Sequence, residues 1–296
     1  MNRRRLSFSL AVLVGCLLLH RVVGGGLVFE AIILGTGYPH GLLGLKYSRR
    51  GIKAAMERTP AKLTILIAVP LGMLAITYGW DVYALIFYFG LHHALSETYF
   101  DNEAGSRHGS WSKGLLVLCI FSGYLSATRA QLGLGFVCDA MLFITALASS
   151  AAFLMLNRSE FAERARIIGF LNNHSWALIG PALAVLAVWY PIDWKVIILY
   201  HFGFYGLLPL VKQGMLSDSN RRTFWIEGAV WNGLGISVFL VMVLFAAVWN
   251  VQFLFSVSYQ CFLALTYMHI TWSFLISPGN PVWIKSLFGQ GSGVPA

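Results

Sequence analysis

Long runs of apolar residues, each about as long as a membrane helix, recur along the chain between short polar segments. A helix needs about 20 mostly apolar residues to cross a bilayer. Since backbone groups in lipid must be satisfied within their own segment, such runs predict helices. Eight to ten spans fit the pattern, because the short first and eighth segments could be re-entrant. The ten segments are 6–23, 26–45, 61–79, 80–99, 114–131, 133–156, 167–189, 195–211, 224–249 and 250–277.

The polar segments predict five helical hairpins and their orientation. Very short turns fall within each hairpin, at 24–25, 80–81, 129–131, 190–193 and 249–250. Longer charged connections fall between hairpins, at 46–60, 101–113, 157–166 and 212–223. With the N-terminus in the cytoplasm, all of the 21 Lys and Arg residues except Arg21, Arg129 and Lys195 lie inside. This bias predicts an all-α polytopic protein of the bacterial inner membrane, with both termini cytoplasmic.

Composition agrees with a membrane protein. Hydrophobic residues make up 57% and charged residues 11%, against roughly 25% charged in soluble domains. These values exclude a disordered chain and an ordinary cytosolic enzyme. A net charge of +9 can indicate nucleic-acid binding. Here the basic residues are concentrated in the connections predicted to face the cytoplasm, as expected of a membrane protein, so we expect no nucleic-acid partner. We expect one integral membrane domain over 1–296, with a Gly-rich mobile tail from about 285.

The N-terminal segment has an alternative interpretation. Arg3, Arg4 and Arg5 precede an apolar run and the string Leu13-Val14-Gly15-Cys16, which is similar to a bacterial lipoprotein cleavage box. Cleavage there would remove the first span and attach lipid to Cys16. The apolar residues that follow favour an uncleaved helix.

Histidines provide the candidate chemistry, because most of them fall at one depth. Measured from the inner boundary at 1.5 Å per residue, His40 lies about 9 Å deep, His93 and His174 about 12 Å, His269 about 13 Å and His201 about 16 Å. Ionisable residues inside membranes are rare and mark functional sites by default.

A metal ion is the ligand that this set of side chains predicts. Neutral imidazole is the commonest metal ligand, and imidazoles from several helices suit Fe, Cu, Mn or Zn. His93 shares a helix face with Glu97, whereas the neighbouring His92 points about 100° away. We expect His40, His93, His201 and His269 as ligands, with His92 as the alternative to His93.

Other polar residues within the segments have less specific roles. Glu97 and His174 are the candidate catalytic or supporting residues beside the metal, although an interhelical hydrogen bond is the simpler interpretation of His174. Glu30 and Asp139, in the outer half, are expected to pair with Arg21 or Arg129 rather than to carry protons. Glu227 and Asn232, near the inner side, are candidates for supporting the ligands.

One string of residues resembles a known family. Gly37-Tyr38-Pro39-His40-Gly41 is similar to the Gly-x-Pro-His-Gly segment of the Brp/Blh family of membrane β-carotene dioxygenases, and the residues around His92 and His93 resemble its second histidine segment. The resemblance implies a multispanning helical enzyme with histidine-ligated iron that cleaves carotenoids. The chain departs from the family at Leu42-Leu43-Gly44, where Ala-Leu-Asp is usual. The family also carries two histidines four apart on one later helix, whereas here His201 has Tyr205 at that spacing and His269 has Ser273.

Three functions follow as hypotheses. The first is a non-haem Fe(II) oxygenase that acts with O₂ on an apolar, lipid-soluble substrate taken from the bilayer. The second is a haem-binding electron-transfer protein, with two histidines as axial ligands. The third is a proton-coupled transporter, in which the histidines relay protons and Pro70 and Pro181 break helices.

Overall fold

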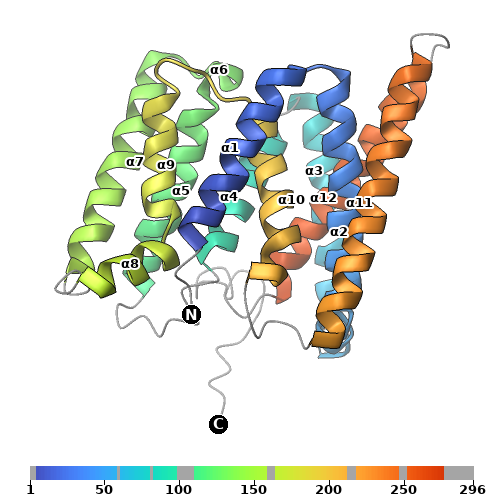
Figure 1. Cartoon of the computed structure of the whole chain (residues 1–296), viewed down its shortest axis with the longest axis horizontal. Helices are drawn as coiled ribbons and strands as arrows, with labels where there is room; N and C mark the ends of the chain where they lie inside the picture. The colour runs from blue at the N-terminus through green and yellow to red at the C-terminus, as the bar shows by residue number, and fades with distance from the viewer. Residues whose placement is uncertain are drawn as a thin grey trace. The chain divides into compact units, whose positions relative to one another are not determined.

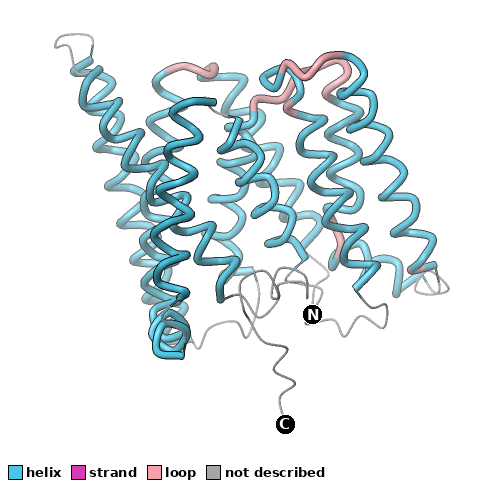
Figure 2. Tube along the Cα trace, turned by 180° about the vertical axis from the view of Figure 1, so that it is seen from behind, coloured by secondary structure: helices cyan, strands magenta, loops and turns pink. Residues whose placement is uncertain are grey.

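The computed structural model describes residues 5–58, 61–80, 83–98, 110–158, 164–211, 218–246 and 252–276. Within these ranges the chain is helical and has no strand (Figures 1 and 2). The described helices are α1 (Arg5–Val23), α2 (Leu27–Arg58), α3 (Ala61–Trp80), α4 (Tyr83–Thr98), α5 (Ser110–Ala127), α6 (Arg129–Leu132), α7 (Phe136–Leu156), α8 (Arg164–Asn173), α9 (Trp176–Leu186), α10 (Trp194–Val211), α11 (Asp218–Ala246) and α12 (Gln252–Ile276).

Each of the ten predicted segments corresponds to helix, so the all-α prediction is confirmed. Three helices in the described ranges are long and apolar enough to cross a membrane, at Arg5–Val23, Phe136–Leu156 and Arg221–Phe245. The larger number of spans stays a prediction. Several expected features lie outside the described residues, namely the turns around 81 and 249–250, most of the charged connections and the tail from 285.

Two helices differ from their predicted segments. α2 continues into the predicted charged connection, as far as Arg58. The segment 167–189 is not one helix but two, because α8 ends at Asn173 and α9 begins at Trp176. Asn172 lies at this break and its side chain bonds to the backbone, since Nδ2 donates to the carbonyl oxygen of Ile168 at 2.7 Å; such bonds compete with those of the helix.

The described residues form two compact units. The first unit takes its residues from Leu10–Tyr78 and Lys195–Trp272, and so contains α2, α3, α11 and most of α1, α10 and α12. The second takes its residues from Asn2–Ser9, Gly79–Trp194 and the segment from Ser273, and contains α4 to α9. The single predicted domain over 1–296 stays a prediction.

In the first unit, α2 and α11 approach each other through glycines. A Cβ atom added to Gly35 would lie 2.6 Å from the backbone of Ile236, and one added to Gly235 would meet the carbonyl oxygen of Gly35. Pro39 explains why this oxygen is available, because it lacks the N–H that would bond to residue 35 within the helix. Glycine on both helices therefore allows α11 to cover the carbonyl that Pro39 leaves free.

Ion pairs connect α2 to its neighbours in this unit. Lys195 Nζ on α10 lies 2.7 Å from Glu30 Oε1, and Lys46 Nζ lies 2.5 Å from Glu227 Oε1 on α11. The expected pairing of Glu30 with Arg21 or Arg129 is therefore wrong, because a lysine distant in sequence lies closer. The carboxylate of Glu227 thus contacts Lys46 on α2.

The remaining pairing expectation fails in the second unit. Arg129 Nη2 donates to the carbonyl oxygen of Ala187 at 3.1 Å. Asp139 Oδ1 is buried and has no hydrogen-bond partner among the described residues. The expected pairing of Asp139 with Arg129 or Arg21 is therefore also wrong in this part of the chain.

The second unit is built around α5, which packs against α4, α7 and α9. Gly123 of α5 lies against the backbone of Gly180, since an added Cβ would lie 2.7–2.9 Å from that residue. Pro181 leaves the carbonyl of Ala177 without its helical donor. Ser150 Oγ of α7 donates to that carbonyl at 2.7 Å, and Cys119 Sγ contacts it at 3.7 Å. Side chains of two neighbouring helices thus replace the missing backbone bond.

Candidate metal centre

Three histidines of the first unit lie together. His40 on α2, His201 on α10 and His269 on α12 each offer one ring nitrogen, and these nitrogens lie within 4.8 Å of one another. The ring centroid of His40 lies 5.2 Å from that of His201 and 5.0 Å from that of His269, both edge to face. Nitrogen ligands at 2.0–2.1 Å from one ion lie roughly 3–4 Å apart. A small closure of the three imidazoles would therefore suit a metal ion.

His40 lies at the centre of the group. Its Nε2 atom is buried and has no hydrogen-bond partner among the described residues. A buried polar atom of this kind calls for an explanation, and a bound cation would supply one. The ring of Phe202 lies 4.9 Å from that of His40 and covers one side of it.

Glycines of the Gly37–Gly41 segment bring the aromatic residues close to α2. A Cβ added to Gly37 would lie 2.8 Å from the ring of Phe202 and would also meet the ring of Phe262. A Cβ added to Gly41 would lie 2.9 Å from the side chain of Leu265. The small residues on either side of His40 therefore allow α12 to approach closely enough to contribute a ligand.

His201 is buried and contacts a tyrosine one turn later. Tyr205 lies with its ring centroid 4.6 Å from that of His201, as expected of residues four apart on a helix. Tyr205 is thus an aromatic neighbour of His201 on the same helix face.

His92 and His93 belong to the second unit and are not members of the three-histidine group. The ring of His93 is stacked on Phe89 at 6.1 Å and meets Trp176 edge to face at 4.4 Å. The ring of His92 meets Phe274 at 6.2 Å. Both imidazoles are buried among aromatic rings, and their role as a fourth ligand stays a prediction.

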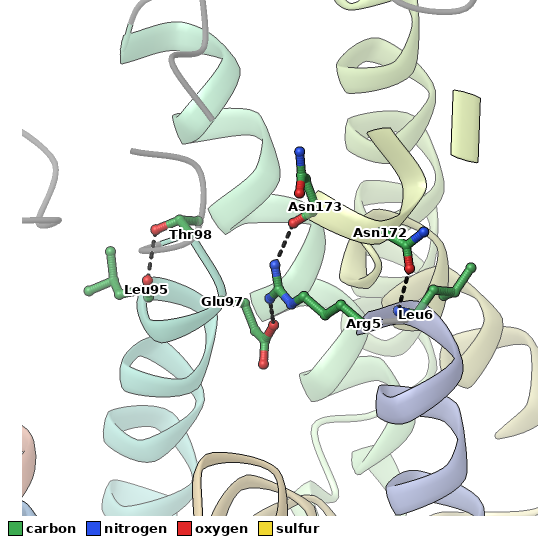
Figure 3. Close-up of polar contacts among 7 residues, drawn as sticks. All are labelled: Arg5, Leu6, Leu95, Glu97, Thr98, Asn172 and Asn173. Atoms are coloured by element: carbon green, nitrogen blue, oxygen red, sulfur yellow. Dashed lines mark hydrogen bonds and ion pairs between the residues drawn. The ribbon is translucent and has the colours of Figure 1, made fainter. Parts of the chain in front are cut away.

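Glu97 forms an ion pair that its sequence neighbourhood did not indicate. Arg5 Nη2 lies 2.5 Å from Glu97 Oε2, and both side chains are buried, with exposures of 4% and 1% (Figure 3). Arg5 Nη1 also donates to the carbonyl oxygen of Asn173 at 2.5 Å, at the end of α8. The backbone N–H of Leu6 donates to Asn172 Oδ1 at 2.9 Å. The first turn of α1 is therefore fixed to α4 and α8 by buried polar contacts.

His174 lies at the break between α8 and α9. Its backbone N–H donates to the carbonyl of Phe170 at 2.9 Å. Its ring contacts those of Phe170 and Phe153, with centroids 4.5 and 5.2 Å away. These contacts agree with a packing role at the helix break, and the catalytic role of His174 stays a prediction.

The other inner-side candidates make local contacts. Asn232 Nδ2 donates to the carbonyl of Gly228, one turn earlier on α11, at 2.6 Å. With Glu227 bound to Lys46, neither residue is among the metal-ligating group in the described ranges.

Comparison of the chain with protein-family models, with curated proteins and with solved structures found no match. The function must therefore be inferred from the three histidines and their surroundings.

Proposed function

We propose that this protein is a membrane-embedded metalloenzyme that holds one first-row transition-metal ion with His40, His201 and His269. The observation that carries the proposal is the convergence of three ring nitrogens, from three different helices, within 4.8 Å. Imidazole suits iron, copper, zinc and nickel. Three histidine ligands leave coordination positions open, as catalytic sites require. The resemblance of the Gly37–Gly41 segment to the Brp/Blh family favours Fe(II).

Exposed apolar surface supports a location in the bilayer. Three described helices have the length and composition of membrane spans, and only 6% of the apolar window of α11 is buried. Large side chains such as Trp231, Leu234 and Leu244 on α11, and Phe136 and Met155 on α7, are exposed. Soluble proteins rarely expose apolar surface on this scale, whereas acyl chains would cover it.

The surroundings of the histidines favour an apolar substrate. The ring of Phe202 covers His40. The ring centroid of Phe262 lies 6.2 Å from that of Phe202 and 6.0 Å from that of Tyr38, so the three rings form one aromatic cluster. These rings would exclude water and orient a lipid-soluble molecule. The ion would supply Lewis-acid or one-electron chemistry, while the three imidazoles hold it in place. We therefore propose an oxidoreductase, of the dioxygenase class, that acts on a polyene or acyl chain.

The metal content of the detergent-purified protein tests this proposal. We expect about one equivalent of iron per chain without a haem Soret band, lost in His40→Ala, His201→Ala and His269→Ala. His20→Gln is the matched control, because His20 on α1 is not in the group and its ring contacts Phe29. A Soret band would indicate haem instead. A metal-free protein from metal-replete cells would contradict the proposal and favour a proton-relay role for the histidines.

A further inference from the structure

The imidazole of His269 lies directly against a glycine of α2. A Cβ added to Gly44 would lie 3.0 Å from Cε1 and 3.1 Å from Nδ1 of His269. Within the part of the chain that the structure describes, no other atom lies within 4 Å of that position, apart from the backbone of α2 and the residues next to Gly44 in the chain. Gly44 follows His40 by four residues, so both occupy one face of the helix. α2 therefore contacts the proposed ligand His269 through its backbone at Gly44 and carries the proposed ligand His40 one turn earlier.

The contact at Gly44 is the last of three that follow one another along both helices, each series advancing by seven residues. Gly37 faces Phe262, Gly41 faces Leu265 and Gly44 faces His269. Ordinary van der Waals contact for a Cβ begins near 3.4 Å. A side chain at position 44 would therefore displace the imidazole by a few tenths of an ångström or push the two helices apart.

We propose that Gly44 is a positioning residue of the metal site, because its lack of a side chain sets the place of the His269 imidazole relative to His40. This inference rests on the proposed metal-binding function. Metal–nitrogen distances are fixed within narrow limits, and a site loosens when its supporting residues shift a ligand.

Cobalt binding tests the inference without any assay of activity. The metal-stripped, detergent-purified full chain is titrated with Co²⁺, whose visible absorption reports ligand number and geometry. We expect Gly44→Ala to weaken Co²⁺ binding by about tenfold or more and to change the absorption bands. Gly72→Ala on α3 is the control, because nothing lies within 4 Å of that position. It should leave both affinity and spectrum unchanged.

A second variant separates positioning from general damage. In the His269→Ala background the imidazole is absent, so Gly44→Ala should change neither the residual Co²⁺ affinity nor the thermal unfolding temperature. If Gly44→Ala alone does not fold, His269→Ala should restore folding. A Gly44→Ala protein with wild-type affinity and spectrum would overturn the positioning role alone, as would a folding defect that His269→Ala does not correct. A wild-type protein that takes up no Co²⁺ would overturn the metal site and the positioning role together.

Discussion

The buried ion pair of Arg5 with Glu97 fixes the position of the first turn of α1. The guanidinium group lies 2.5 Å from the carboxylate and also binds the carbonyl of Asn173 (Figure 3). A buried ion pair is not necessarily stabilising, but the loss of one partner leaves a buried charge uncompensated. The first turn of α1 is therefore held in the second unit by electrostatics as well as by packing.

Removal of one partner should be more harmful than removal of both. We expect Arg5→Leu to lower the free energy of unfolding by about 3–5 kcal/mol. The double variant Arg5→Leu with Glu97→Leu should recover much of that loss. Thermal unfolding in detergent, followed by tryptophan fluorescence, measures both. Lys46→Ala is the control, because its half-exposed pair with Glu227 should contribute at most about 1 kcal/mol. Additive effects of the two leucine substitutions would contradict this account.

The group of His40, His201 and His269 was predictable from sequence only in part. Depth along each helix brings His40, His201 and His269 to similar levels, and the structure adds the lateral convergence that depth cannot supply. The ion pair of Arg5 with Glu97 spans 92 residues of sequence, and no local pattern indicates it. Glycines at 37, 41 and 44 do follow helical spacing, and this signal could have indicated the close approach of another helix.

At the scale of elements, apolar runs predict the helices well but not their interruptions. The run 167–189 is apolar enough to be predicted as one helix, yet it divides between Asn173 and Trp176, next to Asn172, whose side chain bonds to the backbone. Hydropathy averages over a window and so does not register competition for backbone hydrogen bonds. The polar residues themselves, in an otherwise apolar run, were the available signal.

Pro181 and Ser150 form a compensating pair between α9 and α7. Ser150→Ala removes the hydroxyl donor to the Ala177 carbonyl and leaves that acceptor only the weaker Cys119 thiol. We expect a cost of about 0.5–1.5 kcal/mol, the net value of one hydrogen bond. We expect this substitution to lower the unfolding temperature. In a Pro181→Ala background residue 181 regains its N–H, so Ser150→Ala should cost less. Equal effects of Ser150→Ala in both backgrounds, measured by thermal unfolding, would refute the compensation.

Close packing of α5 on α9 depends on Gly123. Its replacement by alanine would place a methyl group 2.7–2.9 Å from the backbone of Gly180, where overpacking costs about 1–3 kcal/mol. The matched control is Gly114→Ala on the same helix, with nothing within 4 Å. The control should be neutral or slightly stabilising, because alanine favours helix over glycine. Equal unfolding temperatures for the two variants would contradict a tight contact at Gly123.

At the scale of the whole molecule, the charge bias predicts which residues face each side of the membrane. Tyr190 lies in a predicted outer turn and is 66% exposed, and Arg158 lies at the end of α7 in a predicted inner connection. Single cysteines at these positions, in a background without the native cysteines, are labelled with an impermeant maleimide. Tyr190→Cys should react in intact cells, and Arg158→Cys only after the membrane is opened. Reaction of both in intact cells would contradict the predicted orientation.

X-ray absorption of the purified protein tests the central claim most directly. At the edge of the bound metal, we predict imidazole scattering from His40, His201 and His269, with metal–nitrogen distances near 2.0–2.1 Å. Each His→Ala variant should lose one imidazole contribution or the metal itself, while His20→Gln should match the wild type. A metal ion whose ligands do not include imidazole, or a spectrum unchanged in all three variants, would contradict the three-histidine site.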